Sequence, residues 1–357
     1  MSASATTTAV LDATDLLFNH DRSGPPQVDG VSFKLRAGKT LGVLGGNECG
    51  KTTLAQLLLG TLKPQRGAVA LHLGSTTSTT PRWLVIARAA LALLIAALAA
   101  VGAPLVRAGG WAPALLLALL EAAQRLRARY GVAGAEIAGL GWAPAAMRRR
   151  GVAYASSEHD AGPSLPAQMS VEELIGRHMP LPASDGAGRR REVLAALKAI
   201  GFQMYKESGV PWGTPEEYLE QGLACGELSG GQKQMVYILA VLASRPKLLI
   251  CDEVLCGLDV DRQASALQML QKLQVETGMA ILYLSVDLQA VQLMAHAAAF
   301  MEKGRLVEHQ DDAHALFDAP REQPTRVYLH LAREIQERAR GRDLTASFQK
   351  GESVFTE

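Results

Sequence analysis

Short apolar runs alternate with turn residues along residues 9–46, a pattern typical of β-strands. The last of these runs predicts a strand at Thr40 to Leu44, and the segment KTTLAQLLLG after it has the apolar spacing of a helix. Beyond residue 151, apolar runs predict strands in VAYA, in KLLIC at 247–251 and in AILYLS at 280–285. Helices are predicted at about 171–177, 188–200, 230–243 and 325–340. Strands that alternate with helices of this length predict an α/β fold with a mostly parallel, doubly wound sheet.

Residues 81–150 depart from that pattern. Ala and Leu supply 35 of these 70 residues, three of the four tryptophans lie among them, and a polar low-complexity linker, HLGSTTSTTP, leads into them. Residues 89–106 are 18 positions without a charge, which is the lower edge of a membrane span, and residues 108–120 add 13 more. We therefore predict an Ala/Leu-rich helical insertion in this part of the chain.

Composition excludes some classes of protein. The chain has 357 residues, of which 48% are apolar and 20% charged, so it is not a disordered chain. Its net charge is +1, and no overall basic excess argues for nucleic acid. The insertion holds nine Arg and two Glu, a net charge of +7, which leaves −6 for the other 287 residues. Neither disulfide-like cysteine spacing nor a secretory signal is evident, so we expect an intracellular protein.

A glycine-rich segment follows the strand at Thr40 to Leu44. Its sequence, GGNECGKT, fits G-x-x-x-x-G-K-[ST], in which successive backbone N–H groups point into one concavity at the positive end of a helix. Lys51 would reach the β- and γ-phosphates of ATP, and the Thr52 hydroxyl would bind Mg²⁺. Because the motif lies between a predicted strand and a predicted helix, ATP binding is favoured over a chance match. The predicted binding residues here are Gly45, Gly46, Asn47, Glu48, Cys49, Gly50, Lys51, Thr52 and Thr53.

Two further motifs complete the candidate chemistry. Asp252 and Glu253 end a buried strand, where Asp252 can hold Mg²⁺ through water and Glu253 can act as general base. Alone, such a pair is common as a solvated turn, and the phosphate-binding segment favours the catalytic interpretation. The second motif is LSGGQ at 228–232, whose Ser hydroxyl and glycine N–H groups could contact a γ-phosphate or simply cap the following helix.

The three motifs, in this order, resemble an ATP-binding cassette (ABC) ATPase over about residues 9–72 and 151–335. The segment LFDAPREQPTRVYLHLA further resembles the C-terminal region of peptide- and nickel-import cassettes. The resemblance implies an α/β fold, with a P-loop RecA-like core and a helical signature subdomain beside the predicted insertion. The expected segments are 1–80 and 246–315 for the core, 81–150 for the insertion, 151–245 for the Q-loop region and signature subdomain, and 316–357 for a C-terminal helical extension.

In this family two cassettes enclose two ATP molecules, each between one phosphate loop and the LSGGQ of the partner. The resemblance implies that Gln232 acts with Lys51 and Glu253 in catalysis and that Asp259 helps to align the dimer. The residues implied to contact the partner's nucleotide are Ser229, Gly230, Gly231 and Gln232.

The adenine-stacking position of the family falls on His20, with Phe18 a close competitor. A plain surface role for His20 is equally open.

Two positions depart from the family pattern. The switch histidine, which contacts the γ-phosphate, falls on Val286, whose side chain has no donor. The Q-loop glutamine falls on Ser157, with Glu158 adjacent. The groups that bind nucleotide and activate water remain, so we expect ATP binding and ATP-dependent dimerisation with slowed hydrolysis, because loss of one transition-state donor lowers a rate by roughly 10²–10³.

The insertion has two interpretations. Because the phosphate-binding segment precedes it and LSGGQ follows it, a membrane-crossing insertion must cross an even number of times. Arginines flank the apolar runs on the cassette side, which matches the positive-inside pattern and predicts membrane contact through 83–124. The alternative is a helical hairpin that buries its Ala/Leu face on a partner subunit.

The sequence thus predicts an ATP-binding and ATP-hydrolysing subunit of an ABC transporter, with ATP and Mg²⁺ as cofactors. The expected partners are a second ABC cassette, identical or different, and separate transmembrane subunits, with no nucleic acid. The expected location is the cytoplasmic face of a membrane, or the equivalent face of an organelle. The alternative is a repurposed cassette that binds ATP as a structural or regulatory subunit of a membrane complex.

Overall fold

The computed structural model describes residues 9–21, 24–73, 147–148, 150–157, 165–182, 185–202 and 213–339. The chain divides into two compact units, one formed by Met1–Leu73 with Leu140–Glu357 and the other by Gly74–Gly139. The expected insertion lies almost entirely outside the described residues, and so do Glu158 and the end of the expected C-terminal extension. Within the described ranges, no helix combines the length and hydropathy needed to cross a bilayer.

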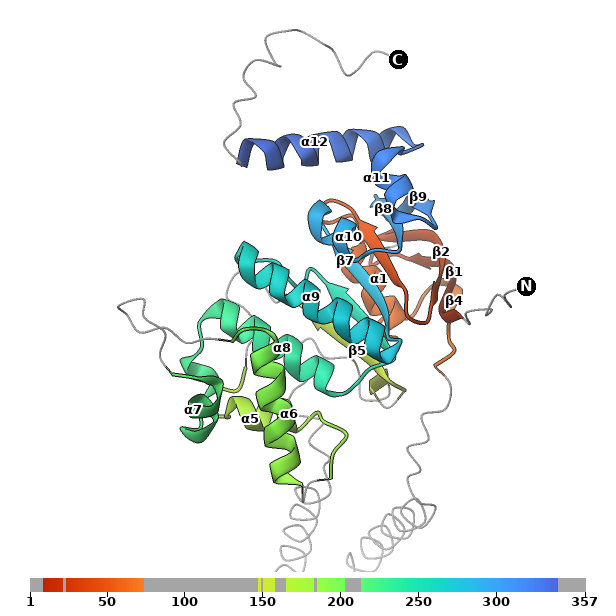
Figure 1. Ribbon diagram of the computed structural model, residues 1–357. Helices are drawn as coiled ribbons and strands as arrows, with labels where there is room; N and C mark the ends of the chain where they lie inside the picture. The colour runs from red at the N-terminus through yellow and green to blue at the C-terminus, as the bar shows by residue number, and fades with distance from the viewer. Residues whose placement is uncertain are drawn as a thin grey trace, which may run out of the picture. The chain divides into compact units, whose positions relative to one another are not determined.

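A six-stranded sheet forms the centre of the first unit (Figure 1), and it confirms the predicted α/β fold. Five strands are parallel and the last, at one edge, is antiparallel to its neighbour. β3, β6 and β7 are buried at every position, as expected for parallel strands covered on both faces. In spatial order the strands are β5 (Val152–Ser156), β6 (Leu248–Asp252), β7 (Ala280–Ser285), β3 (Thr40–Leu44), β8 (Ala297–Glu302) and β9 (Arg305–Gln310).

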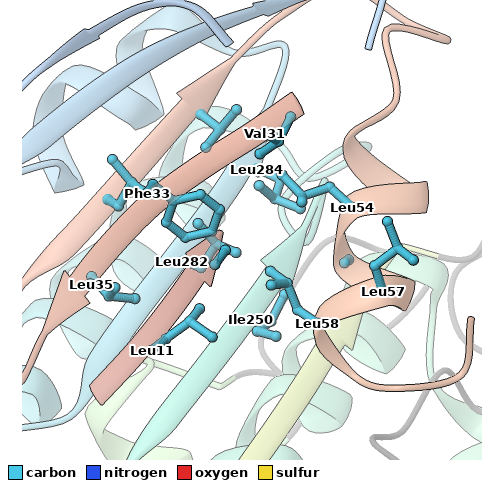
Figure 2. Close-up of a cluster of buried hydrophobic side chains, with 14 of the residues drawn as sticks. Leu11, Val31, Phe33, Leu35, Leu54, Leu57, Leu58, Ile250, Leu282 and Leu284 are labelled. Atoms are coloured by element: carbon cyan, nitrogen blue, oxygen red, sulfur yellow. The ribbon is translucent and has the colours of Figure 1, made fainter. Parts of the chain in front are cut away.

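A separate antiparallel sheet precedes and follows β3 in sequence. It consists of β2 (Val28–Arg36), β1 (Ala9–Phe18) and β4 (Arg66–Leu71), in that spatial order. Alternate residues of β2 are buried, which is the period-two pattern of a half-buried strand. Its buried face packs with α1 (Lys51–Leu58) and the large sheet in one hydrophobic core. Figure 2 shows Phe33 of β2, Leu54 of α1 and Leu282 of β7 in this core.

Among the described residues, four α-helices form the helical part of the unit: α5 (Val171–Gly176), α6 (Gly186–Ala199), α7 (Pro215–Glu220) and α8 (Gly230–Ala243). α8 is buried from Met235 to Leu242, so its apolar sequence is explained by packing on all sides. α7 begins with a capping box between Thr214 and Glu217 and has Pro215 in its first turn. β5, by contrast, pairs with β6, so the first residues of the expected 151–245 segment belong to the large sheet.

The remaining helices follow the later strands. α9 (Val260–Thr277) begins at Asp259, whose carboxylate accepts from the Arg262 N–H, and ends at Gly278 in the left-handed conformation. α10 (Leu288–Met294) lies between β7 and β8 in sequence. α11 (Ala313–Asp318) and α12 (Gln323–Ala339) follow β9 (Figure 1), and the predicted helix at about 325–340 is confirmed in α12.

Candidate active site

The candidate residues meet at one edge of the large sheet. β3, β6 and β7 are parallel, so their carboxyl ends lie at the same edge. The phosphate loop, residues 45–52, follows β3; Asp252 ends β6 and is followed by Glu253; Ser285 ends β7 and is followed by Val286. This topology explains why residues more than 200 positions apart in sequence share a site.

The glycines of the phosphate loop have different structural roles. Gly50 has φ 109°, and a Cβ there would lie 2.1 Å from the Gln27 carbonyl oxygen, so no other residue fits. A Cβ on Gly45 would lie 2.4 Å from the Met301 carbonyl oxygen. A Cβ on Gly46 would meet nothing within 4 Å, so open space lies above that position. Gly46 therefore borders the space in which a phosphate could lie, whereas Gly50 and Gly45 are required by packing.

Lys51 is held at the centre of the loop. Its ammonium donates to the carbonyl oxygens of Gly45 (2.9 Å) and Gly46 (2.8 Å) and lies 3.3 Å from Glu253 Oε1. The side chain is only 6% exposed, so the loop carbonyls and the Glu253 carboxylate replace the water that would otherwise solvate the charge. The Cys49 sulfur lies 3.8 Å from the same ammonium, and burial raises the pKa of that thiol.

Asp252 has a buried carboxylate, one oxygen of which accepts no hydrogen bond from the described residues. Its Oδ2 accepts from the Tyr154 hydroxyl at 3.1 Å, and among the described residues its Oδ1 has no hydrogen-bond partner. Burial raises the pKa of Asp252, and the Thr52 and Tyr154 side chains oppose that shift. An exposed Thr52 hydroxyl beside a buried, incompletely satisfied carboxylate is the oxygen donor set that Mg²⁺ prefers, so these residues fit the metal.

Glu253 is positioned by three neighbouring groups. Besides the ion pair with Lys51, its Oε2 accepts from the Ser285 hydroxyl and from the Val286 backbone N–H, both at 3.2 Å. The backbone of Glu253 has φ +53°, a conformation that non-glycine residues adopt mainly where the surrounding structure holds them. Its own N–H donates to the Leu284 carbonyl oxygen of β7. Glu253 is therefore fixed between the end of β7 and the phosphate loop.

The signature turn, Ser229 to Gln232, begins α8. The Ser229 hydroxyl accepts from the Gln232 N–H at 3.4 Å, and the Gln232 side chain accepts from the Ser229 N–H at 2.8 Å. This capping box bears out the structural interpretation of the motif. Ser229 and Gly230 are exposed, whereas Gln232 is buried with its amide turned back onto the turn. A Cβ on Gly231 would lie 2.5 Å from the Arg262 guanidinium, which places that cation against the signature turn.

His20 lies in the connection between β1 and β2, which approaches the phosphate loop at Gln27. Its backbone N–H donates to the Gln27 side chain at 2.8 Å, and the Gln27 carbonyl contacts the Gly50 position. Its exposed ring makes an edge contact with Phe18, with the ring centroids 4.8 Å apart. The two candidate stacking residues are therefore neighbours of each other, and both are hydrogen-bonded to Gln27, which approaches the phosphate loop at Gly50.

The structure brings together Lys51, Thr52, Asp252 and Glu253, as the sequence predicts. Glu48, the residue least suited to a phosphate site, is exposed at φ 61°, and Asn47 is exposed with it, whereas Thr53 is half-buried. Two supporting hydroxyls were not predicted, those of Tyr154 and Ser285. The strand register pairs Tyr154 with Ile250, which places it near Asp252, but that register is not evident from the sequence.

Comparison with known proteins agrees with the class that this fold and site define, an ATP-binding cassette. The model of the ABC transporter family matches residues 28–96 and 122–255. The chain belongs to the ABC transporter family. The predicted α/β cassette fold and the family are thereby confirmed, whereas the predicted helical insertion stays a prediction, and the cassettes of this family bind ATP with Mg²⁺.

Several curated relatives are importer components by name. A probable peptide ABC transporter ATP-binding protein of Sinorhizobium fredii is 28% identical over 79% of this chain and 58% of its own length. The oligopeptide transport ATP-binding protein OppD of Mycobacterium tuberculosis is 28% identical over 85% of this chain and 37% of its own length. The nickel import ATP-binding protein NikE of Shigella flexneri is 25% identical over 79% of this chain and 77% of its own length. The predicted resemblance to peptide and nickel importers is confirmed, although the chain spans about three fifths of the first relative and a third of the second.

Solved structures show the same fold. CbiO1 from Clostridium perfringens, part of the ABC transporter complex CbiONQ, has a TM-score of 0.50 at 19% identity and matches 93% of this chain and 95% of its own. An ATP-binding cassette in a dimeric post-hydrolysis state, bound to ADP and Pi, has a TM-score of 0.52 at 14% identity and matches 85% of this chain and 98% of its own.

Proposed function

We propose that this chain is the ATP-binding and ATP-hydrolysing subunit of an importer-type ABC transporter. The observation that carries the proposal is the convergence of the Lys51 ammonium, the buried Asp252 carboxylate and the Glu253 carboxylate at one edge of a parallel sheet, next to a loop with open space at Gly46. The names of the relatives support a role in import.

Each residue of the site has a chemical role in this proposal. The loop N–H groups and the Lys51 ammonium would bind the β- and γ-phosphates, and Lys51 would exchange its loop carbonyls for phosphate oxygens. Thr52 and Asp252 would hold Mg²⁺, which when bound neutralises phosphate charge. Glu253 would accept a proton from the attacking water, and its bonds to Ser285 and Val286 orient its Oε2.

The site is completed by a second cassette. Ser229 and Gly230 are exposed on the signature turn, and they would contact the nucleotide bound by a partner, which is either a second copy of this chain or a different cassette. Gln232 would support catalysis across that interface by holding the turn, because its side chain is part of the capping box. His20 or Phe18 would stack on the adenine, and Asp259 would contribute to alignment of the dimer.

In this proposal the cassette would drive separate transmembrane subunits that form the transport pathway. The cassette would act at the cytoplasmic face of the membrane or its organellar equivalent. Residues 83–124 would contact the membrane directly or pack on a partner subunit. The proposal includes no nucleic-acid partner. Resistance of the isolated protein to extraction by alkaline carbonate would support the membrane hairpin; extraction without detergent would rule it out.

Hydrolysis would be slow because Val286 offers no side-chain donor to a γ-phosphate. Its backbone N–H donates to Glu253, so it is already engaged within the protein. Val286→His is expected to raise turnover of the purified assembly roughly 10²-fold. An unchanged rate after this substitution, or a fast wild-type rate, would contradict slowed hydrolysis without contradicting ATP binding.

A second function is favoured by the same departure at Val286 and by Ser157, which stands at the Q-loop glutamine position. In this alternative the cassette is a structural or regulatory subunit that retains ATP. Nucleotide content and steady-state hydrolysis of the native assembly discriminate the two: bound ATP that persists for hours favours the structural role, and steady phosphate release favours transport.

A further inference from the structure

α12 makes an unexpected connection to the candidate active site. The Tyr328 hydroxyl donates to the Val286 carbonyl oxygen at 3.3 Å, and Val286 is the residue whose N–H donates to Glu253. Tyr328 is 75 positions beyond Glu253 in sequence. Two hydrogen bonds therefore link the C-terminal helix to the carboxylate that would act as general base.

Both backbone polar groups of Val286, its N–H and its carbonyl, make hydrogen bonds. A valine side chain offers no hydrogen bond, so the peptide groups on either side of its Cα supply the polar contacts at this position. The N–H on one side donates to Glu253 Oε2, and the carbonyl on the other side accepts from Tyr328. With both flanking peptides held, the N–H keeps its direction toward Glu253.

Tyr328 is itself held in place. Its ring lies against Phe300 of β8, with centroids 5.0 Å apart, and the side chain is half-buried. Burial raises the pKa of Tyr328 to about 12, and the nearby charges of Glu253 and Asp287 contribute. The phenol therefore stays protonated at physiological pH and remains a donor.

The start of α12 is anchored independently of Tyr328. Glu308 of β9 accepts from the backbone N–H groups of Arg321 (2.9 Å) and Glu322 (3.1 Å), just before the helix begins. The Arg333 guanidinium donates to the Phe317 carbonyl oxygen at 2.6 Å. On its inner side, Thr325 and Leu329 are buried. α12 is therefore anchored on both sides of Tyr328, whose hydroxyl reaches Val286.

We propose that Tyr328 is a positioning residue for Glu253: α12 holds the Val286 backbone, and the Val286 N–H holds the catalytic carboxylate. This inference rests on the proposed hydrolytic function of Glu253. It assigns the C-terminal helix a part in catalysis rather than in packing alone.

Tyr328→Phe tests the proposal, because it removes the hydroxyl and keeps the ring against Phe300. One neutral hydrogen bond that acts through an intermediate group is worth about a two- to tenfold change in rate. We expect kcat for ATP hydrolysis by the full chain to fall by about that factor, with KM for ATP unchanged. Amide hydrogen exchange across residues 285–288 should rise in the same variant.

Tyr218→Phe is the matched control. Its hydroxyl donates to the Gly213 carbonyl oxygen at 2.9 Å in the helical part, so the control also removes one tyrosine-to-carbonyl bond. The control should leave kcat and exchange at residues 285–288 unchanged.

The exchange measurement separates the positioning role of Tyr328 from the proposed hydrolytic function of Glu253. Unchanged exchange at 285–288 in Tyr328→Phe overturns the positioning role whether or not the protein hydrolyses ATP, and raised exchange with an unchanged kcat overturns it also. Absence of hydrolysis in the wild-type protein contradicts the proposed function instead, and the exchange result then decides by itself whether Tyr328 holds Val286.

Discussion

The phosphate loop and the signature turn differ in how their polar groups are satisfied. Around the phosphate loop, charged groups face one another: Lys51 lies 3.3 Å from Glu253, and Asp252 is buried with one oxygen unsatisfied among the described residues. The residues of the signature turn itself carry no charge, and Ser229 and Gln232 hydrogen-bond to each other in a capping box.

The difference indicates what each region lacks. The phosphate loop holds buried charge that a metal and a phosphate would complete, so binding there replaces internal contacts. The signature turn is already satisfied and presents exposed Ser229 and Gly230, so it can meet a ligand without giving up internal bonds. The phosphate loop therefore has polar groups that a bound ligand would satisfy. The signature turn has its own polar groups satisfied and is exposed to the nucleotide of a partner.

Glu253→Gln gives the largest expected effect, and it acts on the charged region alone. The amide cannot accept the proton, so hydrolysis should fall about 10²–10⁴-fold while ATP binding persists. Phosphate release and nucleotide binding to the purified protein measure the two quantities. A variant that hydrolyses ATP at the wild-type rate would remove Glu253 from the role of base.

Ser229→Arg tests the neutral region. A long cation on the exposed turn should block contact with a second cassette and lower hydrolysis by about 10²-fold, the order expected for loss of a transition-state contact. Binding of MgATP to the single chain should be unchanged, because the phosphate loop is intact. If single-chain ATP binding were lost as well, the two regions would not be separable.

Gly50→Ala and Gly46→Ala separate packing from binding within the phosphate loop. Gly50 has φ 109° and a Cβ there would lie 2.1 Å from a carbonyl oxygen, so Gly50→Ala should lower the free energy of unfolding by about 2 kcal/mol or more. Gly46→Ala meets open space and should leave stability unchanged but weaken ATP binding. Denaturant unfolding and nucleotide titration measure the two effects. Equal destabilisation by both variants would contradict the distinct roles of these glycines.

Asp252→Asn should raise the stability of the protein, whereas Gly50→Ala should lower it, and the change should be smaller. Burial raises the pKa of Asp252 above its usual 3.8, so the stability contributed by its protonated form is present below pH 3.8 and is lost as pH rises through the folded-state pKa. The nucleotide-free variant should therefore melt at a higher temperature than wild type at pH 7. This gap should close at pH values below 3.8.

Ser229→Ala is the matched contrast to Asp252→Asn, because it removes a helix cap and should lower stability by about 1 kcal/mol. Thermal melts across this pH range compare the two. A gap between wild type and Asp252→Asn that did not depend on pH would contradict burial as the cause.

Much of this site could be predicted from sequence because its chemistry lies in local motifs. The phosphate loop, Asp252 with Glu253, and the signature turn each occupy a few consecutive residues, and their order restricts the fold. The antiparallel pairing of β9 and the bond from Tyr154 to Asp252 could not be predicted, since they depend on sheet register. Tyr328 gives no local signal at all, because its contact with Val286 depends on where α12 is anchored.

The measurement that tests the central claim most directly is complementation between two inactive variants. Glu253→Gln keeps an intact signature turn, and Ser229→Arg keeps an intact phosphate loop, so a mixed pair contains one complete site and one doubly altered site. We predict that an equal mixture of the two purified variants regains part of the wild-type rate of ATP hydrolysis. A mixture as inactive as its components, measured beside an active wild-type protein, would contradict a site shared between the two regions of two chains.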